Sequence, residues 1–318
     1  MRIVIDCDPG VDDALMLALA LASPEVEVLA VTTVAGNADV DVTTANAASI
    51  LRLCDRDDIP VATGARRALV HAYGHDLPPP HGENGVGGVV LPPGAERDER
   101  HAVELLRDVL ASNAAGSVTV VATAPLTNIA LLLALYPQVA DRIGRVIVMG
   151  GGVGTGNITP VAEFNTWCDP ESTHRVFTQP DLDVCMVGLD ITRRARLSAA
   201  DVQVLANGSS VAATLARMVA GYADFDDKGW AMHDAVIVAA LLQPGLLTTQ
   251  RGLVHVDTSS GSGRGQTIVE FRATEDARVV GRFPYVTAAA LEIATDLDVD
   301  AFRRLVVGRL ADRSTPAR

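Results

Sequence analysis

Four carboxylates fall within eight residues near the start of the chain, in the segment DCDPGVDD from Asp6 to Asp13. A tight turn at its Pro-Gly pair would bring Asp8 close to Asp13. Because their charges would repel, a bound cation is the natural reason to assemble them. Oxygen ligands alone favour a hard cation, Ca²⁺ or Mg²⁺. Helix capping by Asp12 and Asp13 is the alternative, but it explains one or two acids rather than four. The segment therefore predicts a metal site.

A second candidate is the pair His233 and Asp234, which comes just before the apolar segment VIVAALL. Asp234 offers a further carboxylate to a metal. His233 is a candidate acid, because the ordinary pKa of histidine lies near neutrality. Taken alone, the pair is better explained as a helix cap beside a surface histidine.

The segment VAEFNTWCDP offers a third candidate. Glu163 and Asn165 are two residues apart, so in an extended segment they face the same side. Together they could bind vicinal hydroxyls, with the glutamate accepting and the asparagine donating. A polar loop with a helix cap at Asp169 is an equally good explanation.

The glycine-rich segment MGGGVGTGN, from Met149 to Asn157, follows an apolar run. It lacks the Lys-Ser/Thr pair of a phosphate-binding P-loop and does not meet the dinucleotide pattern GxGxxG. We expect a close approach of its backbone to a ligand instead. The segment TAPLTN, residues 123–128, is explained by a strand end followed by a helix cap.

These segments need elements to position them, and the first half of the chain alternates strand-like and helix-like stretches. Continuous apolar strands separated by helices indicate a parallel sheet that is covered on both faces. We therefore predict an α/β fold with an open, mostly parallel, Rossmann-like sheet and helices on both faces. Ligands of such sheets bind beyond the carboxyl ends of the strands. The predicted strands are residues 3–5, 26–34, 59–62, 118–122, 146–149 and 184–187, and the predicted helices are 12–22 and 42–54.

The second half is less regular. Residues 71–100 are rich in proline and glycine, and a loop of that length is usually functional or mobile. We predict one domain over residues 1–318, with a disordered tail at 312–318. Further expectations are a mostly helical segment near the site at 198–242, a β segment at 254–257 and 267–271, and a helix at 299–310.

The chain has 318 residues and a net charge of −13. Such a surface repels polyanions, so we expect neither nucleic acid nor an anionic membrane as a partner. The four cysteines form no CxxC pair, which favours free thiols in a reducing compartment. The first residues do not read as a signal peptide, and the longest apolar run, residues 14–22, is too short to span a bilayer. A cytoplasmic location is expected.

Taken together and in order, the motifs resemble those of the inosine-uridine nucleoside hydrolase family, across roughly the whole chain. The resemblance implies Ca²⁺-dependent hydrolysis of the N-glycosidic bond of ribonucleosides, which releases the free base and ribose. The motifs are DCDPGVDD, TTVAGN at 32–37, HGENG at 81–85, TAPLTN, MGGG with Gly156 and Asn157, AEFN at 162–165, and His233 with Asp234.

The resemblance also assigns roles to individual residues. One Ca²⁺ would be held by Asp8, Asp13, Asp234 and the backbone carbonyl of Thr123. Asp8 would activate the water, and His233 would protonate the departing base. A small-molecule nucleoside is the implied partner, in an enzyme that forms a homodimer or homotetramer. The implied substrate-binding residues are Asp12, Asn37, Asn157, Glu163 and Asn165 around the ribose, and His81 on a mobile loop.

The base preference is left open by the sequence. Members of the family often place tyrosines before the His-Asp pair, where they shape the base pocket. The corresponding stretch here is GYADFDDKGWAMHD, and its candidates are Tyr222, Phe225, Lys228 and Trp230.

Two other functions would explain part of the sequence. A phosphohydrolase of the haloacid dehalogenase type also has an Asp-x-Asp pair, as in Asp6 and Asp8, but it continues as DxDxT, and no basic phosphate clamp is evident. A non-catalytic nucleoside binder would need neither a water-activating aspartate nor an acid such as His233. Hydrolysis is therefore the favoured reading.

Overall fold

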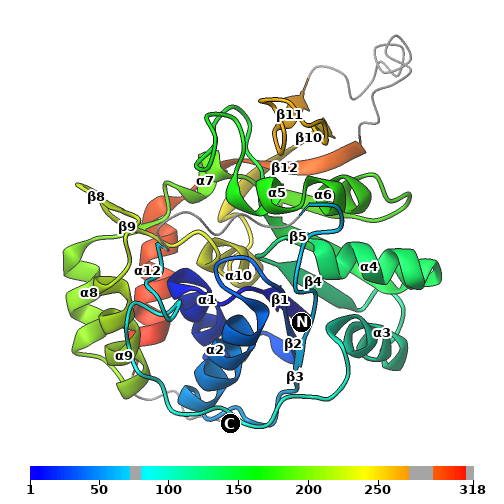
Figure 1. Cartoon of the computed structure of the whole chain (residues 1–318). Coiled ribbons are helices and arrows are strands. Elements are labelled where there is room, and N and C mark those ends of the chain that lie inside the picture. Colours follow the sequence, from blue (N-terminus) through cyan, green and yellow to red (C-terminus); the bar gives the residue numbers. More distant parts are fainter. Residues whose placement is uncertain (72–79, 272–288, 313–318) are drawn as a thin grey trace.

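The computed structural model describes residues 1–71, 80–271 and 289–312, and a nine-stranded sheet runs through its middle (Figure 1). The strand order is β3-β2-β1-β4-β5-β6-β12-β10-β11. The strands are β1 (Arg2–Cys7), β2 (Glu27–Thr33), β3 (Val61–Thr63), β4 (Val118–Ala122), β5 (Ile143–Met149), β6 (Val184–Val187), β10 (Leu247–Val256), β11 (Thr267–Glu270) and β12 (Ala289–Leu297).

All neighbouring strands from β3 to β12 pair in parallel, whereas β10 is antiparallel to both β12 and β11. The first six strands follow the order 3-2-1-4-5-6 of a doubly wound fold. The order reverses between β1 and β4, and ligands of such sheets bind outside the carboxyl ends of the strands at that point. The predicted open, mostly parallel sheet is confirmed.

Apolar side chains alternate along β1 between the two faces of the sheet, as the pleat requires. Ile3 and Ile5 belong to one apolar cluster, and Val4 belongs to another. Figure 1 shows the helices that cover the two faces. The helices that contribute side chains to the first cluster are α1 (Val11–Leu21), α2 (Val40–Leu53), α8 (Ala199–Ala206), α9 (Ser210–Ala220), α10 (Ala235–Leu242) and α12 (Val299–Ala311). The helices that contribute to the second are α3 (Ala102–Ser112), α4 (Thr127–Leu135) and α6 (Pro170–Phe177).

Helices α1 and α10 pack against each other in the interior. Every residue of α1 from Val11 to Ala20 is buried, and so is the first part of α10. A helix that is apolar on all sides needs such a position. The acidic residues lie at the N-terminal ends of these helices: Asp12 and Asp13 in the first turn of α1, and Asp234 at the N-cap of α10.

One buried side chain, Asn128 at the start of α4, ties together the carboxyl ends of three strands. Its Nδ2 donates to Asp6 Oδ1 (2.8 Å) and to the carbonyl of Thr33 (2.9 Å), and its Oδ1 accepts from the amide of Ala65 (2.9 Å). Asn128 therefore fixes the edge of the sheet on which the acidic segment rests.

The segment 198–242 is helical in α8, α9 and α10, but the prediction missed a hairpin within it. Strands β8 (Phe225–Asp226) and β9 (Gly229–Ala231) form a small antiparallel sheet with β7 (Arg196–Leu197). Strands of two or three residues are too short to show a periodic pattern. The turn depends on Gly229, whose φ of +116° is strained for other residues.

The end of the sheet also differs from the prediction. Strand β10 begins at Leu247 rather than at residue 254, because its first half is polar and exposed and shows no apolar run. Strand β12 was not predicted. The described part of residues 71–100 contains no helix and no strand longer than an isolated bridge residue, as expected. The tail predicted to be disordered lies, from residue 313 onward, outside the described residues. The remaining elements are η1 (Pro137–Arg142), α5 (Phe164–Cys168) and α7 (Leu189–Thr192).

The contacts of Asn128 predict a large loss of stability when its amide is removed. Asn128→Ala removes a hydrogen-bond partner from a carboxylate, a carbonyl and an amide in the interior, so we expect the free energy of unfolding to fall by about 2–4 kcal/mol. Urea denaturation followed by circular dichroism measures this change. Gln203→Ala, at an exposed position of α8, is the control and should change stability by less than about 0.5 kcal/mol. An equal effect of the two substitutions would contradict the role of Asn128.

Candidate active site

A cavity of about 660 Å³ opens at the carboxyl edge of the sheet, beside the point where the strand order reverses. Apart from Asp8 and Asp13, every metal, catalytic and substrate-binding residue that the resemblance implied lines it: Asp12, Asn37, His81, Thr123, Asn157, Glu163, Asn165, His233 and Asp234. The fold therefore brings together residues from seven separate motifs of the sequence.

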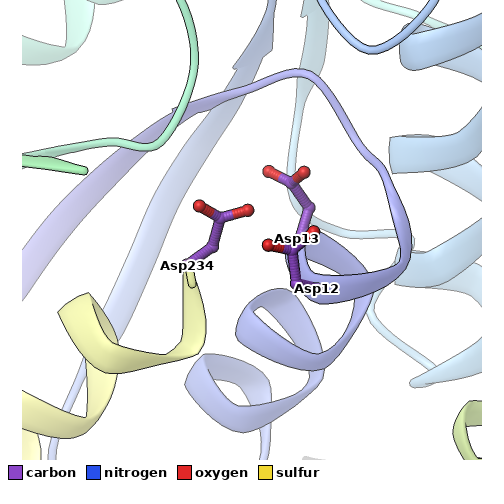
Figure 2. Close-up of side chains that lie close together, drawn as sticks. All are labelled: Asp12, Asp13 and Asp234. Atoms are coloured by element: carbon purple, nitrogen blue, oxygen red, sulfur yellow. The ribbon is translucent and has the colours of Figure 1, made fainter. Parts of the chain in front are cut away.

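Three carboxylates converge on one point beside the cavity (Figure 2). Asp12, Asp13 and Asp234 each offer one oxygen, and these oxygens lie within 4.8 Å of one another. Burial, and then the charge of Asp12, raise the pKa of Asp13 to about 7. The pKa of Asp234 is raised well above its usual range by burial and by the charges of Asp12 and Asp13. A cation at this point would relieve the repulsion.

Asp8 lies beside this group rather than within it. Its Oδ2 accepts from the backbone amide of Asn37 (2.7 Å), while its Oδ1 is buried and has no hydrogen-bond partner among the described residues. Burial and the charge of Asp13 raise the pKa of Asp8 well above its usual range. Asp12 Oδ1 is likewise buried without a hydrogen bond to any described group. An orphaned buried carboxylate oxygen is costly, so both atoms fit a site that binds a cation or a polar ligand.

Two local features hold Asp8 and Asp13 in place. The chain after β2 passes so close that a Cβ on Gly36 would lie 1.9 Å from Asp8 Oδ2, so only glycine fits there. Asp13 Oδ2 accepts from the amide of Gly10 (2.9 Å), and Asp13 Oδ1 accepts from the hydroxyl of Thr123 (3.1 Å). The carboxylates of Asp13 and Asp8 therefore accept hydrogen bonds from backbone amides at the start of α1 and after β2.

Asp6, the first acid of the segment, cannot act as the nucleophile of a phosphohydrolase. It is fully buried, and its Oδ1 accepts from the hydroxyl of Thr32 (2.6 Å) and the amide of Asn128. Burial raises its pKa to about 6. Its position inside the sheet makes it a structural residue.

Glu163 and Asn165 both reach the cavity, but not by the route that we expected. They do not share an extended segment: Glu163 caps α5, and Asn165 lies in the first turn of that helix. The carboxylate of Glu163 accepts from the amides of Asn165 (2.8 Å), Thr166 (3.1 Å) and Gly151 (2.9 Å). Asn165 Nδ2 donates to the carbonyls of Thr123 and Met149, both at 3.1 Å. The alternative cap at Asp169 is also present, on α6.

The glycine-rich segment uses its amides internally. Gly151 donates to Glu163, Gly152 donates to the hydroxyl of Thr267 (2.8 Å), and Val153 donates to Asp190. These amides are therefore not free to cradle a phosphate. The end of the segment, at Asn157, lines the cavity.

His81 and Tyr222 form one wall of the cavity. Their rings stack at 4.7 Å between centroids and 16° between planes. His81 Nδ1 accepts from the amide of Val11 (3.0 Å), and burial lowers the pKa of this histidine. A neutral ring that accepts at Nδ1 carries its proton on Nε2. Of the four candidates for the base pocket, Tyr222 lines the cavity, whereas Phe225, Lys228 and Trp230 do not. The rings of Phe225 and Trp230 pack against each other in the hairpin at a tilt of 41°.

His233 makes two side-chain contacts, which the sequence did not reveal. Its Nδ1 lies 2.8 Å from the hydroxyl of Thr192, and its Nε2 lies 3.0 Å from the carboxylate of Asp224. The hydrogen bond from His233 lowers the pKa of Asp224. The hairpin is the signal that could have revealed the contact between Asp224 and His233, because it turns the chain back so that these two residues meet.

Comparisons with known proteins agree with this geometry. The family model described as inosine-uridine preferring nucleoside hydrolase matches residues 3–304. The chain is 41% identical to the pyrimidine-specific ribonucleoside hydrolase RihA of Enterobacter sp., over 99% of both chains. It is 37% identical to the inosine-uridine preferring nucleoside hydrolase of Leishmania major, over 97% of both chains. The solved structure of the purine-preferring ribonucleoside hydrolase from Gardnerella vaginalis covers 98% of both chains with a TM-score of 0.86 at 29% identity. The chain therefore belongs to the inosine-uridine preferring nucleoside hydrolase family and is a nucleoside hydrolase.

Proposed function

We propose that this enzyme cleaves ribonucleosides with one bound Ca²⁺, with Asp8 as the base that activates water and His233 as the acid that protonates the leaving nucleobase. The observation that carries the proposal is the buried group of carboxylates at the cavity, with an orphaned oxygen on both Asp8 and Asp12. A site that only bound a neutral nucleoside would not need this concentration of buried charge.

The residues present fit a hard cation. All of the donors are oxygens, which Ca²⁺ prefers over the nitrogen and sulfur ligands of zinc. Asp8, Asp13, Asp234 and the carbonyl of Thr123 would hold it, and the proximity of Asp12 adds negative charge. The carbonyl of Thr123 accepts one bond from Asn165 and retains a second lone pair. When bound, the ion would orient the ribose diol and lower the pKa of a water.

Asp8 is suited to take a proton from that water. Its Oδ2 is held by the amide of Asn37, which leaves Oδ1 available as a base. In the reaction the water oxygen forms a bond to C1′ of the ribose as the bond from C1′ to the base nitrogen breaks. The water gives its proton to Asp8, and the electron pair of the broken bond passes to the base.

The ribose develops positive charge as the glycosidic bond weakens, much as in O-glycoside hydrolysis. We propose that Asp12, Asn37, Asn157, Glu163 and Asn165 surround this sugar, which their positions on the cavity wall support. Carboxylate and amide oxygens favour the developing cation. Because these side chains are held rigidly at strand ends and helix caps, they need to move little when the transition state forms.

The base would lie toward His81, Tyr222 and His233, which line the same cavity. A departing nucleobase anion is a poor leaving group, so protonation by His233 lowers the barrier. The relatives described above are named for purine, pyrimidine and mixed preferences, so the preferred base of this enzyme is a matter for assay.

We further propose a homodimer or homotetramer in the cytoplasm, acting in nucleoside salvage as one domain. Among the described residues, no helix has the length and apolar character needed to cross a membrane. The match to relatives over nearly their whole length supports a single domain.

The carboxylate group predicts tight binding of calcium. Purified enzyme should contain about one equivalent of Ca²⁺ by mass spectrometry, because three or more buried carboxylates repel one another without it. Chelation should abolish ribose release, and added Ca²⁺ should restore it. Stoichiometric zinc, or no bound metal at any calcium concentration, would contradict the proposed site.

Asp8→Ala should nearly abolish turnover. Loss of a general base alone lowers kcat by about 10²–10⁴-fold, and disturbance of the metal adds to this loss. A reducing-sugar assay across purine and pyrimidine nucleosides measures the effect. Asp58→Ala, which removes an exposed acid paired with Arg56, controls for the change in net charge and should remain fully active. More than a tenth of wild-type activity in Asp8→Ala would rule out the assigned role.

His233→Ala should affect substrates unequally. The variant should lower kcat for inosine by about 10²-fold or more with little change in KM, because the proton is needed only in the transition state. Nitrophenyl riboside has a leaving group that needs no proton and should be cleaved at close to the wild-type rate. Calcium content must be checked, since the neighbouring Asp234 is a proposed ligand. Equal losses on both substrates with the metal intact would make His233 a structural or binding residue.

A further inference from the structure

We propose that Arg193 is a positioning residue for Asn157: its guanidinium holds the peptide bond between Gly156 and Asn157, and so keeps Asn157 in place on the cavity wall. The contacts between α7, whose C-cap is Arg193, and the glycine-rich segment that ends at Asn157 carry this inference. Arg193 is not among the residues that line the cavity, so it would act through Asn157. The inference rests on the proposed role of Asn157 in binding the sugar.

The guanidinium of Arg193 binds two successive residues of the glycine-rich segment. Its Nη1 donates to the hydroxyl of Thr155 (2.9 Å), and its Nη2 donates to the carbonyl of Gly156 (2.8 Å). The backbone amide of Arg193 donates to the carbonyl of Leu189 (3.0 Å), so the side chain extends from a helical turn. Hydrogen bonds from a charged donor are stronger than neutral ones, and a planar group with two acceptors fixes direction as well as distance.

The peptide bond before Asn157 is held on both of its polar sides. Its carbonyl, from Gly156, accepts from Arg193, and its amide, from Asn157, donates to the carbonyl of Ala162 (3.1 Å). The chain is closely packed here, since a Cβ on Gly156 would lie 2.1 Å from the carbonyl oxygen of Thr159. Because a peptide group is planar, fixing both of its polar atoms also fixes where the next residue leaves it. Arg193 thereby sets the position of Asn157 on the cavity wall.

The rest of α7 holds the start of the same segment. The amide of Leu189 donates to the carbonyl of Gly151 (2.8 Å), and the carboxylate of Asp190 accepts from the amide of Val153. Arg193 makes the third attachment, and it is the one nearest to the end of the segment that lines the cavity. Loss of its side chain would therefore release that end while the start of the segment stays attached.

The proposed task of Asn157 determines how a loss of positioning would show in the kinetics. The amide of asparagine can both donate to and accept from a sugar hydroxyl. Every ribonucleoside carries the same sugar, and so does nitrophenyl riboside. Displacement of Asn157 should therefore slow all of these substrates equally, whatever their leaving group.

Arg193→Met tests this inference, because methionine keeps an unbranched stem but donates no hydrogen bond. In the full-length enzyme with calcium present, kcat and KM are measured for nitrophenyl riboside and for the nucleoside that the wild type cleaves fastest. We expect kcat/KM to fall about 10–100-fold for both, since a small misplacement of a binding group has effects of this size. Arg194→Met is the matched control and should keep the wild-type rates, because Arg194 pairs with Asp296 and donates to the carbonyl of Leu297 instead.

A double-mutant cycle shows whether Arg193 acts through Asn157. In the Asn157→Ala background, Arg193→Met should change kcat/KM by less than about twofold, because the group that it positions is already gone. The loss in Arg193→Met should divide between kcat and KM as it does in Asn157→Ala. If Arg193→Met folds poorly, Thr155→Val replaces it in the cycle, since it removes only the acceptor of Nη1. Its loss should be smaller, equal on both substrates and absent in the Asn157→Ala background.

Two results would overturn the proposal. The charge of Arg193 could act instead on Asp224, whose carboxylate contacts His233. Arg193→Met would then slow the nucleoside at least about tenfold more than nitrophenyl riboside. Additive losses when Arg193→Met is combined with Asn157→Ala would also contradict it, since they would mean that the two residues act independently.

The same assays distinguish the failure of this inference from failure of the proposed function. If the wild type released no ribose from any nucleoside, or if Asn157→Ala kept the wild-type kcat/KM, both would be wrong. If Asn157→Ala lost activity while Arg193→Met behaved like Arg194→Met, the role of Asn157 would stand and only the positioning role would be wrong.

Discussion

The burial of several like charges at one point is the constraint on which the rest of this structure depends. Asp8, Asp12, Asp13 and Asp234 are almost completely removed from water, and this burial, followed by the repulsion between neighbouring carboxylates, raises the pKa values of Asp8, Asp13 and Asp234. The protein offsets part of this cost with backbone amides, from Gly10 and Asn37, and with the hydroxyl of Thr123. One oxygen of Asp8 and one of Asp12 have no hydrogen-bond partner among the described residues, so part of the cost of burying these charges is not offset by them.

The fold supplies a second, less local compensation. The acids lie at the N-terminal ends of α1 and α10, where the partial positive charge of each helix favours carboxylates. Both helices are apolar on nearly all sides, so they bind firmly into the core and cannot turn their acids toward solvent. Asn128 holds the strand ends beneath them. Packing energy far from the cavity thereby keeps the repelling groups together.

The sequence predicted the parts of the molecule that repeat a strong local pattern. Valine-rich runs predicted the parallel strands, and the density of acids in DCDPGVDD predicted the cluster before any contact was known. Short or polar elements were not predicted, because two-residue strands and the exposed half of β10 show no periodic pattern of apolar residues. The contact of Asp224 with His233 was not predicted for the same reason, because it depends on the hairpin formed by the short strands β8 and β9. Glu163 and Asn165 were selected for a geometry that they do not adopt, since α5 rather than an extended segment presents them.

The two ends of the cavity are attached to the protein in different ways. Asp8 and Thr123 follow directly from β1 and β4, and Asn37 lies four residues after the end of β2, so the central sheet sets their positions. His81 and Tyr222 lie on connecting segments, where the imidazole of the histidine accepts from the Val11 amide at the start of α1 and stacks on the tyrosine ring. A substitution at the second end therefore need not shift the carboxylates at the first. A cavity attached in this way can change its shape at one end while the other end stays fixed, and the relatives that match this chain are named for different nucleobase preferences.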